Sequence, residues 1–134
     1  MDTWVHIVGG GLSGLSLASS LARHQVLPGP VVISEPEPER LTKKTFSFWL
    51  TDEEHAILNP EHTHSNWQVS TKKLTTLHTG QRFRYGTRSG KHVLDECQAV
   101  ISSHPQILQV KEAIGAAPKA DHVFDSRPIA PSSF

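Results

Sequence analysis

The sequence lacks three features that would narrow its class: cysteine pairs, an excess of charge of one sign, and long apolar runs. One cysteine in 134 residues excludes an intrachain disulfide framework and is typical of a reducing compartment such as the cytoplasm. Because 13 basic residues balance 13 acidic ones, net charge gives no reason to expect nucleic acid or an anionic membrane as a partner. No stretch reaches the roughly 20 uninterrupted apolar residues of a membrane-spanning helix. The apolar N-terminus has no basic start, so we expect no signal peptide.

Apolar residues make up 37% of the chain, and their spacing is that of an α/β protein. Short β-branched runs predict strands, and apolar positions that recur every three or four residues predict helices. We expect strands at 4–8, 31–33, 107–110 and 122–125, helices at 12–23 and 91–103, and short strands at 67–69, 73–78 and 81–85. The segment 31–33 is apolar throughout, which is typical of a parallel sheet covered on both faces.

A glycine-rich turn carries the strongest chemical signal. Gly9, Gly11 and Gly14 match the pattern G-x-G-x-x-G between a predicted strand and a predicted helix. The first glycine allows a tight turn, the second lets a pyrophosphate approach the backbone, and the third lets the helix pack closely on the sheet. The helix would begin at Leu12 and Ser13, where free N–H groups and the positive end of the helix dipole favour phosphates. This pattern predicts dinucleotide binding.

Glu35 supplies the second half of the same fingerprint. It closes the second predicted strand about 20 residues after the last glycine, where an acidic side chain accepts hydrogen bonds from ribose hydroxyls. A carboxylate there disfavours a 2′-phosphate, so we expect an adenosine with a free ribose. The fingerprint alone does not separate NAD from FAD, and a glycine-rich turn beside a solvated glutamate is the alternative interpretation.

Four segments of the chain resemble flavoproteins of the lycopene cyclase family. They are VHIVGGGLSGLSLASSLAR, VVISEPEPER, KTFSFW and HVFDSRP. The resemblance implies FAD as the cofactor and a cofactor-side role for Asp125 and Arg127 in the last segment. The third segment of the family usually begins with arginine, and here it begins with Lys44. A planar bidentate donor is thereby replaced by a point charge, which places a contact of Lys44 with flavin or phosphate in question.

The resemblance also implies an activity. Members of the family close the ends of linear lycopene into ionone rings in carotenoid biosynthesis, as intramolecular lyases or isomerases with no net redox change. It further implies lycopene or a related carotene as the substrate, NAD(P)H as a possible reductant of the flavin, and peripheral contact with a membrane. A negative partner fixed in an apolar site suits a developing carbocation.

The chain also departs from the family pattern. The acidic motifs that carry protonation in the family have no counterpart, so no catalytic residue is assigned. We expect an N-terminal fragment that holds flavin weakly by itself. The expected fold class is α/β: a Rossmann-like FAD/NAD(P)-binding parallel sheet with an inserted antiparallel β patch, and an incomplete one. The nucleotide-binding part would comprise roughly residues 1–45 and 90–128, and the inserted segment of a substrate domain roughly residues 46–89.

Two other functions remain open at this point: a truncated, non-catalytic dinucleotide-binding module, or another flavoprotein such as a monooxygenase. The aromatic residues Phe46, Phe48 and Trp49 either line a flavin or carotene site or form a core patch. We expect no metal site, since His62-x-His64 has no cysteine nearby and fits a polar loop. Four further side chains have structural interpretations: the three acids at 52–54 begin a helix, and Cys97 is buried.

Overall fold

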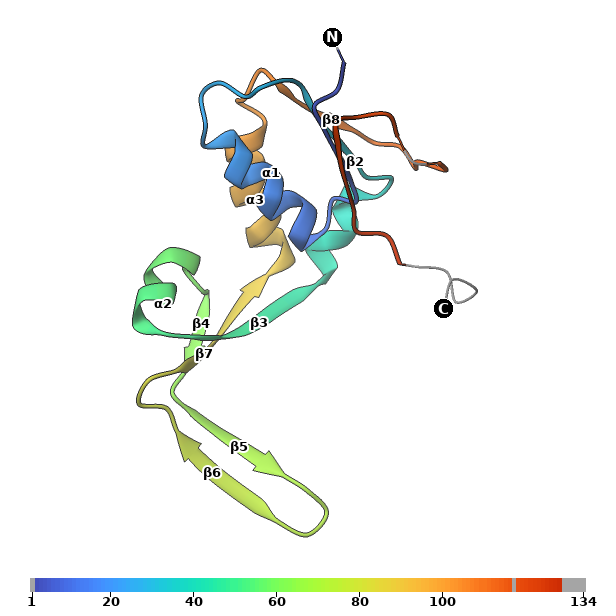
Figure 1. Cartoon of the computed structure of the whole chain (residues 1–134). Helices are drawn as coiled ribbons and strands as arrows, with labels where there is room; N and C mark the ends of the chain where they lie inside the picture. The colour runs from blue at the N-terminus through green and yellow to red at the C-terminus, as the bar shows by residue number, and fades with distance from the viewer. Residues whose placement is uncertain (1, 117, 129–134) are drawn as a thin grey trace. The chain divides into compact units, whose positions relative to one another are not determined.

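A computed structural model of the chain describes residues 2–116 and 118–128. These residues divide into two compact units (Figure 1). The first contains the described residues up to Lys43 and from Lys91 onward, and the second is Lys44–Gly90. Among the described residues, no helix is both long enough and apolar enough to cross a membrane.

The first unit is built on a sheet of four parallel strands. Its elements are β1 (Val5–Val8), α1 (Leu12–Ala22), β2 (Val31–Ser34), the 3₁₀ helix η1 (Pro38–Lys43), α3 (Gly90–Ile101), β8 (Ile107–Val110) and β9 (His122–Asp125). The strand order is β8-β2-β1-β9. Val5 is in register with Val31 on one side and with His122 on the other. The predicted α/β class and all four predicted strands of this sheet are therefore confirmed.

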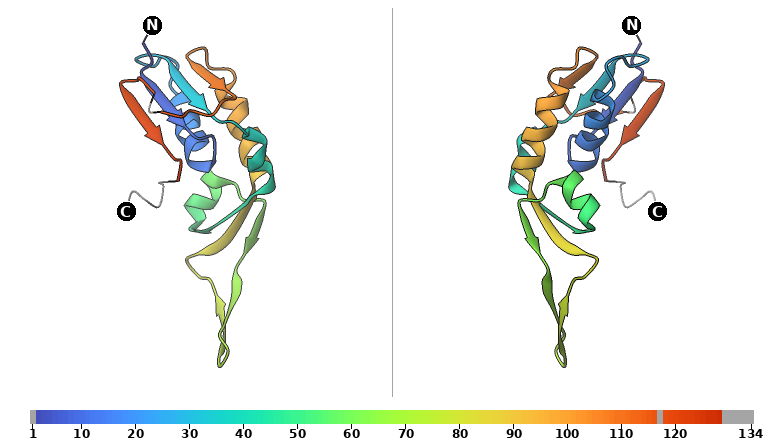
Figure 2. Two further views of the ribbon diagram at one scale, coloured as in Figure 1. Left: turned by 90° about the vertical axis from the view of Figure 1, so that its right-hand side faces the viewer. Right: turned by 90° about the vertical axis from the view of Figure 1, so that its left-hand side faces the viewer.

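Helices α1 and α3 lie on the same side of the sheet (Figure 2). This follows from right-handed crossovers, because the chain steps from β1 to β2 and then to β8 in one direction. The core between helices and sheet is aliphatic. Its buried residues include Ile7, Leu15, Ala18, Val31, Ile33, Val93 and Ile101. Cys97 is buried with them, as predicted.

The strand at 31–33 is buried or half-buried, as expected, but the two outer strands of the sheet are more exposed. Leu108 in β8 is 58% exposed and Val123 in β9 is 41% exposed. Both are in register with central residues of the face that α1 and α3 do not cover, since Leu108 pairs with Val32 and Val123 with His6. The apolar run at 31–33 therefore indicated a buried central strand, but it could not show whether other residues bury the outer strands β8 and β9.

The second unit contains two antiparallel sheets. Its elements are β3 (Thr45–Leu50), α2 (Asp52–Leu58), β4 (His62–His64), β5 (Asn66–Ser70), β6 (Thr75–Thr79) and β7 (Arg84–Ser89). Strand β7 lies between β3 and β4, and β5 pairs with β6 as a hairpin. The strand expected at 81–85 is corrected: it begins only at Arg84 and continues to Ser89. Helix α2 begins at the predicted acids, with a capping box between Thr51 and Glu54.

Candidate functional site

The glycine turn between β1 and α1 is held by close backbone contacts. Gly9 has a φ of +110°, a conformation that other residues rarely adopt. Its N–H donates to the carbonyl of Ser34 at 2.8 Å, and a Cβ added at Gly9 would lie 2.2 Å from Ser126 Oγ. A Cβ at Gly14 would lie 2.0 Å from the carbonyl oxygen of Gly9. The first and third glycines are thus needed for the turn itself and for close helix–strand packing.

Gly11 is different, because none of the described residues occupies the space beside it. It is the N-cap of α1 with φ −79° and ψ −164°, and no described neighbour lies within 4 Å of an added Cβ. No side chain caps the helix, and its first turn, which begins at Leu12 and Ser13, has no acidic residue. The N-terminal end of α1 therefore presents open space and the positive end of its dipole together.

Glu35 lies directly after β2 and bonds to the turn. Its Oε2 accepts from the N–H of Gly10 at 2.8 Å, and its Oε1 accepts from the N–H of Glu37 at 3.0 Å. A Cβ at Gly10 would lie 2.8 Å from Cβ of Glu35. Each carboxylate oxygen keeps a second lone pair for a further donor. Glu35 therefore orders the glycine turn and can still accept a hydrogen bond from a ligand.

The segment after β9 packs against the same turn, although more than a hundred residues separate the two in sequence. Ser126 donates to the carbonyl of Val8 twice, from its N–H at 3.0 Å and from its Oγ at 3.1 Å. Arg127 bonds to the Asp125 carboxylate through Nε at 2.9 Å and Nη2 at 2.5 Å, and Nη1 donates to the carbonyl of Ile114. These contacts bring the first and last motifs of the sequence to one edge of the sheet.

The ion pair between Asp125, the last residue of β9, and Arg127 shifts the pKa values of both its members. Side-chain and then backbone hydrogen bonds from Arg127 lower the pKa of Asp125 to about 2. In return, the Asp125 carboxylate raises the pKa of Arg127. The pair is partly exposed, with 37% of each side chain accessible, so both groups stay charged at every physiological pH.

A cavity of about 330 Å³ lies at this edge of the sheet. It is lined by Val8, Gly9, Gly11, Ser34, Glu35, Pro36, Arg40, Glu112, Ala113, Ile114, Ser126, Arg127 and Pro128. The structure thus brings four predicted residues together around one space: Gly9, Gly11, Glu35 and Arg127. In open parallel sheets, ligands bind outside the carboxyl ends of the strands, where this cavity lies.

The other predicted site residues lie elsewhere. Ser13, Gly14 and Asp125 line a separate cavity of about 200 Å³ beside α1. Leu12 is not among the residues that line either cavity. Lys44 is exposed and belongs to the second unit, so its contact with a cofactor stays a prediction.

Sequence reasoning missed several residues of the larger cavity. Arg40, in η1, adds a cation, and its Nε lies 3.6 Å from a Glu37 carboxylate oxygen. Ser126 was inside a recognised motif but had no assigned role. Glu112 and Ile114 come from the loop after β8. Of these residues, only Arg40 could have been found from the sequence, because it is a basic residue five positions after Glu35.

His6 lies buried in β1 and bonds to a residue of the cavity wall. Its Nε2 is 2.7 Å from Oγ of Ser34. Burial lowers the pKa of His6, while the negative charge of Glu112 opposes that shift. A neutral imidazole therefore supports the Ser34 side of the cavity.

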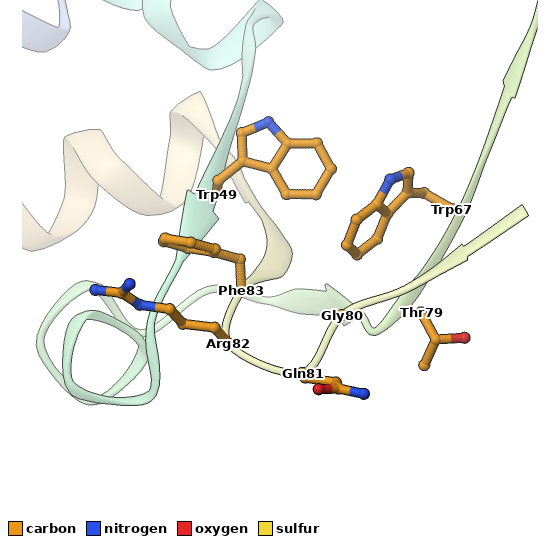
Figure 3. A pocket seen from close by; sticks show the side chains of 7 residues that line it. All are labelled: Trp49, Trp67, Thr79, Gly80, Gln81, Arg82 and Phe83. Atoms are coloured by element: carbon orange, nitrogen blue, oxygen red, sulfur yellow. The ribbon is translucent and has the colours of Figure 1, made fainter.

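The second unit has its own pocket, of about 480 Å³ and mainly apolar (Figure 3). Trp49, Trp67 and Phe83 contribute aromatic rings, and the segment Thr79–Arg82 supplies the rest of the lining. The rings of Trp49 and Trp67 meet edge to face with centroids 4.7 Å apart, and Trp49 also contacts Tyr85 at 4.9 Å. Such pairs stabilise an aromatic cluster beyond the area they bury.

Strand alternation places Phe46 and Phe48 on one side of β3 and Trp49 on the other. Phe46 and Phe48 are half-buried on the side of β3 that also carries the buried Leu50. Trp49 points to the opposite side and lines the pocket. Trp49 therefore lines a pocket, and the two phenylalanines do not line it.

His62 and His64 are exposed on β4, so the polar loop expected there is a short strand instead. In the described part of the chain, no group of three or more His, Cys, Asp or Glu side chains is placed to hold a metal ion.

Comparison with protein-family models and with curated proteins finds no match to this chain. The assignment of a function therefore depends on the geometry described above.

Proposed function

We propose that the first unit binds the ADP portion of FAD at the glycine turn, in a Rossmann-like arrangement. The observation that carries this proposal is the open position beside Gly11, at the uncapped N-terminal end of α1. Gly11 has an ordinary φ and no described neighbour beside it, so neither backbone strain nor packing is a reason for glycine at this N-cap within the G-x-G-x-x-G pattern. Room for an approaching phosphate supplies a reason.

The residues around the cavity fit such a ligand. Gly11 lines the cavity, and the N–H groups of Leu12 and Ser13, which follow it outside the lining, would receive the pyrophosphate. Arg40 and Arg127 add positive charge at the cavity wall, and Glu35 and Glu112 add negative charge. Glu35 has carboxylate lone pairs left for ribose hydroxyls. The cavity of about 330 Å³ is at the lower end of the roughly 300–1,000 Å³ of small-molecule sites, which suits half of a dinucleotide.

The choice of FAD, and of a lycopene cyclase-like flavoprotein, is supported by the resemblance of four segments and by the arrangement of two of them. The segments at 5–23 and 122–128 lie together, with β1 paired to β9 and Ser126 bonded to Val8. Bound flavin would supply an electron-rich partner for a developing cation. The lone buried cysteine fits the cytoplasmic location that we propose.

We further propose that the aromatic pocket of the second unit receives an end of the apolar substrate, lycopene or a related carotene. Trp49, Trp67 and Phe83 converge on it, while the side chain of Gln81 points away (Figure 3). Apolar walls exclude water, and aromatic faces stabilise positive charge on a bound hydrocarbon. No acid lines this pocket, so no catalytic residue is assigned to the cyclisation.

Isothermal titration calorimetry on the whole chain tests the nucleotide proposal. FAD and ADP should both bind, FMN, which lacks the adenosine half, should not, and NAD should bind better than NADP because Glu35 repels a 2′-phosphate. Gly11→Val should abolish binding and leave the circular dichroism spectrum unchanged, because its side chain enters the ligand space and not the core.

Gly115→Val is the matched control, since no described neighbour lies within 4 Å of a Cβ added at Gly115 and the residue lies outside the cavity lining. It should bind FAD like the unmodified chain. Equal FAD affinity of the Gly11→Val and Gly115→Val variants would refute the assignment of the glycine turn.

A further inference from the structure

The β5–β6 hairpin ends in a turn that displays two adjacent lysines. Strand pairing runs from Asn66 with Thr79 to Ser70 with Thr75, which leaves Thr71–Leu74 as the connection. Thr71 fixes this turn: its N–H donates to the carbonyl of Leu74 at 2.7 Å, and its Oγ1 accepts from the N–H groups of Lys73 and Leu74. Lys72 and Lys73 therefore occupy the apex of an ordered turn.

Exposed aliphatic side chains surround this apex. Val69 is 52% exposed, Leu74 is 64% exposed and Leu77 is 79% exposed. Register places them on different sides of the hairpin, since Leu77 pairs with Gln68 and Val69 with Thr76. A flat protein partner would cover only one side. A hydrocarbon layer that surrounds an inserted tip would cover both.

The local charge is one-sided, although the chain as a whole is neutral. Between Glu61 and Asp95 the sequence has no acidic residue, while lysine and arginine occupy six positions. Within the described residues, no ion pair involves Lys72 or Lys73. Two unneutralised lysines beside aliphatic side chains complement a surface that is anionic outside and apolar beneath.

Nucleic acid fits this tip less well. Single strands bind to basic grooves in which aromatic side chains stack on the bases. The aromatic residues of the hairpin are at its base, where Trp67 stacks on His78 and contacts Trp49. At the apex the side chains beside the lysines are aliphatic, which favours lipid.

We propose that the tip of the hairpin, Val69–Leu77, docks on an anionic lipid surface, with Lys72 and Lys73 at the headgroups and the aliphatic side chains in the interface. This contact is independent of nucleotide binding. It gives the second unit, which holds the aromatic pocket, a direct route to an apolar phase.

Co-sedimentation of the whole chain with vesicles, in the absence of flavin, tests the proposal. The chain should partition onto phosphatidylcholine vesicles that contain phosphatidylglycerol much more strongly than onto phosphatidylcholine alone. The double variant Lys72→Gln/Lys73→Gln should lose roughly 25-fold in partition coefficient on the anionic vesicles, about fivefold per lysine. Leu74→Ser/Leu77→Ser should lose about tenfold or more on them, because it removes the inserted apolar surface.

The matched control is Lys43→Gln/Lys119→Gln, which removes the same charge from exposed positions outside the hairpin and should bind like the unmodified chain. An equal loss in this control would refute the assignment to the hairpin. Equal binding to vesicles with and without phosphatidylglycerol would also refute the proposal. Binding to a DNA oligonucleotide without binding to vesicles would refute it as well. Because no flavin is present in the assay, these results test the lipid contact independently of the proposed nucleotide site.

Discussion

The glycines of the first turn are required for different reasons, and substitutions can separate them. A Cβ at Gly14 would meet the carbonyl oxygen of Gly9 at 2.0 Å and the Ile7 side chain at 3.2 Å. Backbone cannot move aside as a flexible side chain can. Glycine is therefore needed at this position for stability whether or not a ligand binds.

We expect Gly14→Ala to lower the free energy of unfolding by about 2 kcal/mol or more, a cost typical of overpacking against a fixed element. Urea denaturation followed by circular dichroism measures it. Gly115→Ala is the control and should stay within about 0.5 kcal/mol of the unmodified chain. If Gly14→Ala were equally harmless, the close packing of α1 on β1 would be incorrect.

The Asp125–Arg127 pair predicts a pH dependence with a definite sign. Because hydrogen bonds from Arg127 lower the pKa of Asp125 from 3.8 to about 2, the folded state binds this proton later than the unfolded state. The contribution of the pair to stability is therefore complete above pH 3.8 and is lost as the pH falls toward 2. An NMR titration of the carboxyl carbon should give a midpoint near 2 in the unmodified chain and a normal midpoint in Arg127→Gln. A normal midpoint in both would contradict the pairing.

At the scale of elements, the hairpin β5–β6 depends on its base. A two-stranded hairpin is marginally stable alone in water, and Trp67 joins this one to β3 through its contact with Trp49. A Cβ at Gly80 would also lie 2.8 Å from the Trp67 ring. The aromatic cluster is therefore the anchor of the hairpin as well as the wall of the pocket.

We expect Trp67→Ala to reduce amide hydrogen-exchange protection in β5 and β6 by about tenfold or more, because local opening no longer breaks an aromatic contact. Protection in β1 and β2 should not change. The control, Trp4→Phe, alters a tryptophan of the first unit that contacts His122 and should leave the hairpin unchanged. Uniform loss of protection across the chain would contradict a local anchor.

The elements that could be predicted are those fixed by local sequence. The apolar runs at 107–110 and 122–125 matched β8 and β9 to the residue, and the glycine turn marked the start of α1. Strands β3 and β4 were missed because both depend on pairing with β7, and a pairing partner is not visible in a short window. Gln81 to Phe83 alternate as a strand would, yet they line a pocket.

At the scale of the whole molecule, the candidate site could be predicted only in part. Gly9, Gly11 and Glu35 belong to one fingerprint with a known spacing, so their convergence followed from a single motif. Ser126 reaches Val8 only because β9 pairs with β1, and Arg40 reaches the cavity because η1 follows β2. Such contacts arise from topology, which composition does not determine.

Whole-chain neutrality was likewise an incomplete guide to partners. The balance of 13 basic and 13 acidic residues gave no reason to expect an anionic surface, but it averaged over a stretch from His62 to Leu94 that has no acid. The distribution of charge along the chain, and not its sum, supports the proposed lipid contact.

The central claim is that a dinucleotide binds at the N-terminal end of α1, and an NMR titration with ADP tests it most directly. Successive ¹H–¹⁵N spectra of the labelled chain should show the largest shift changes at the amides of Gly11, Leu12 and Ser13, with smaller changes at Glu35. The same titration of Gly11→Val should show none. Shift changes confined to other parts of the chain, or no changes at saturating ADP, would contradict the account.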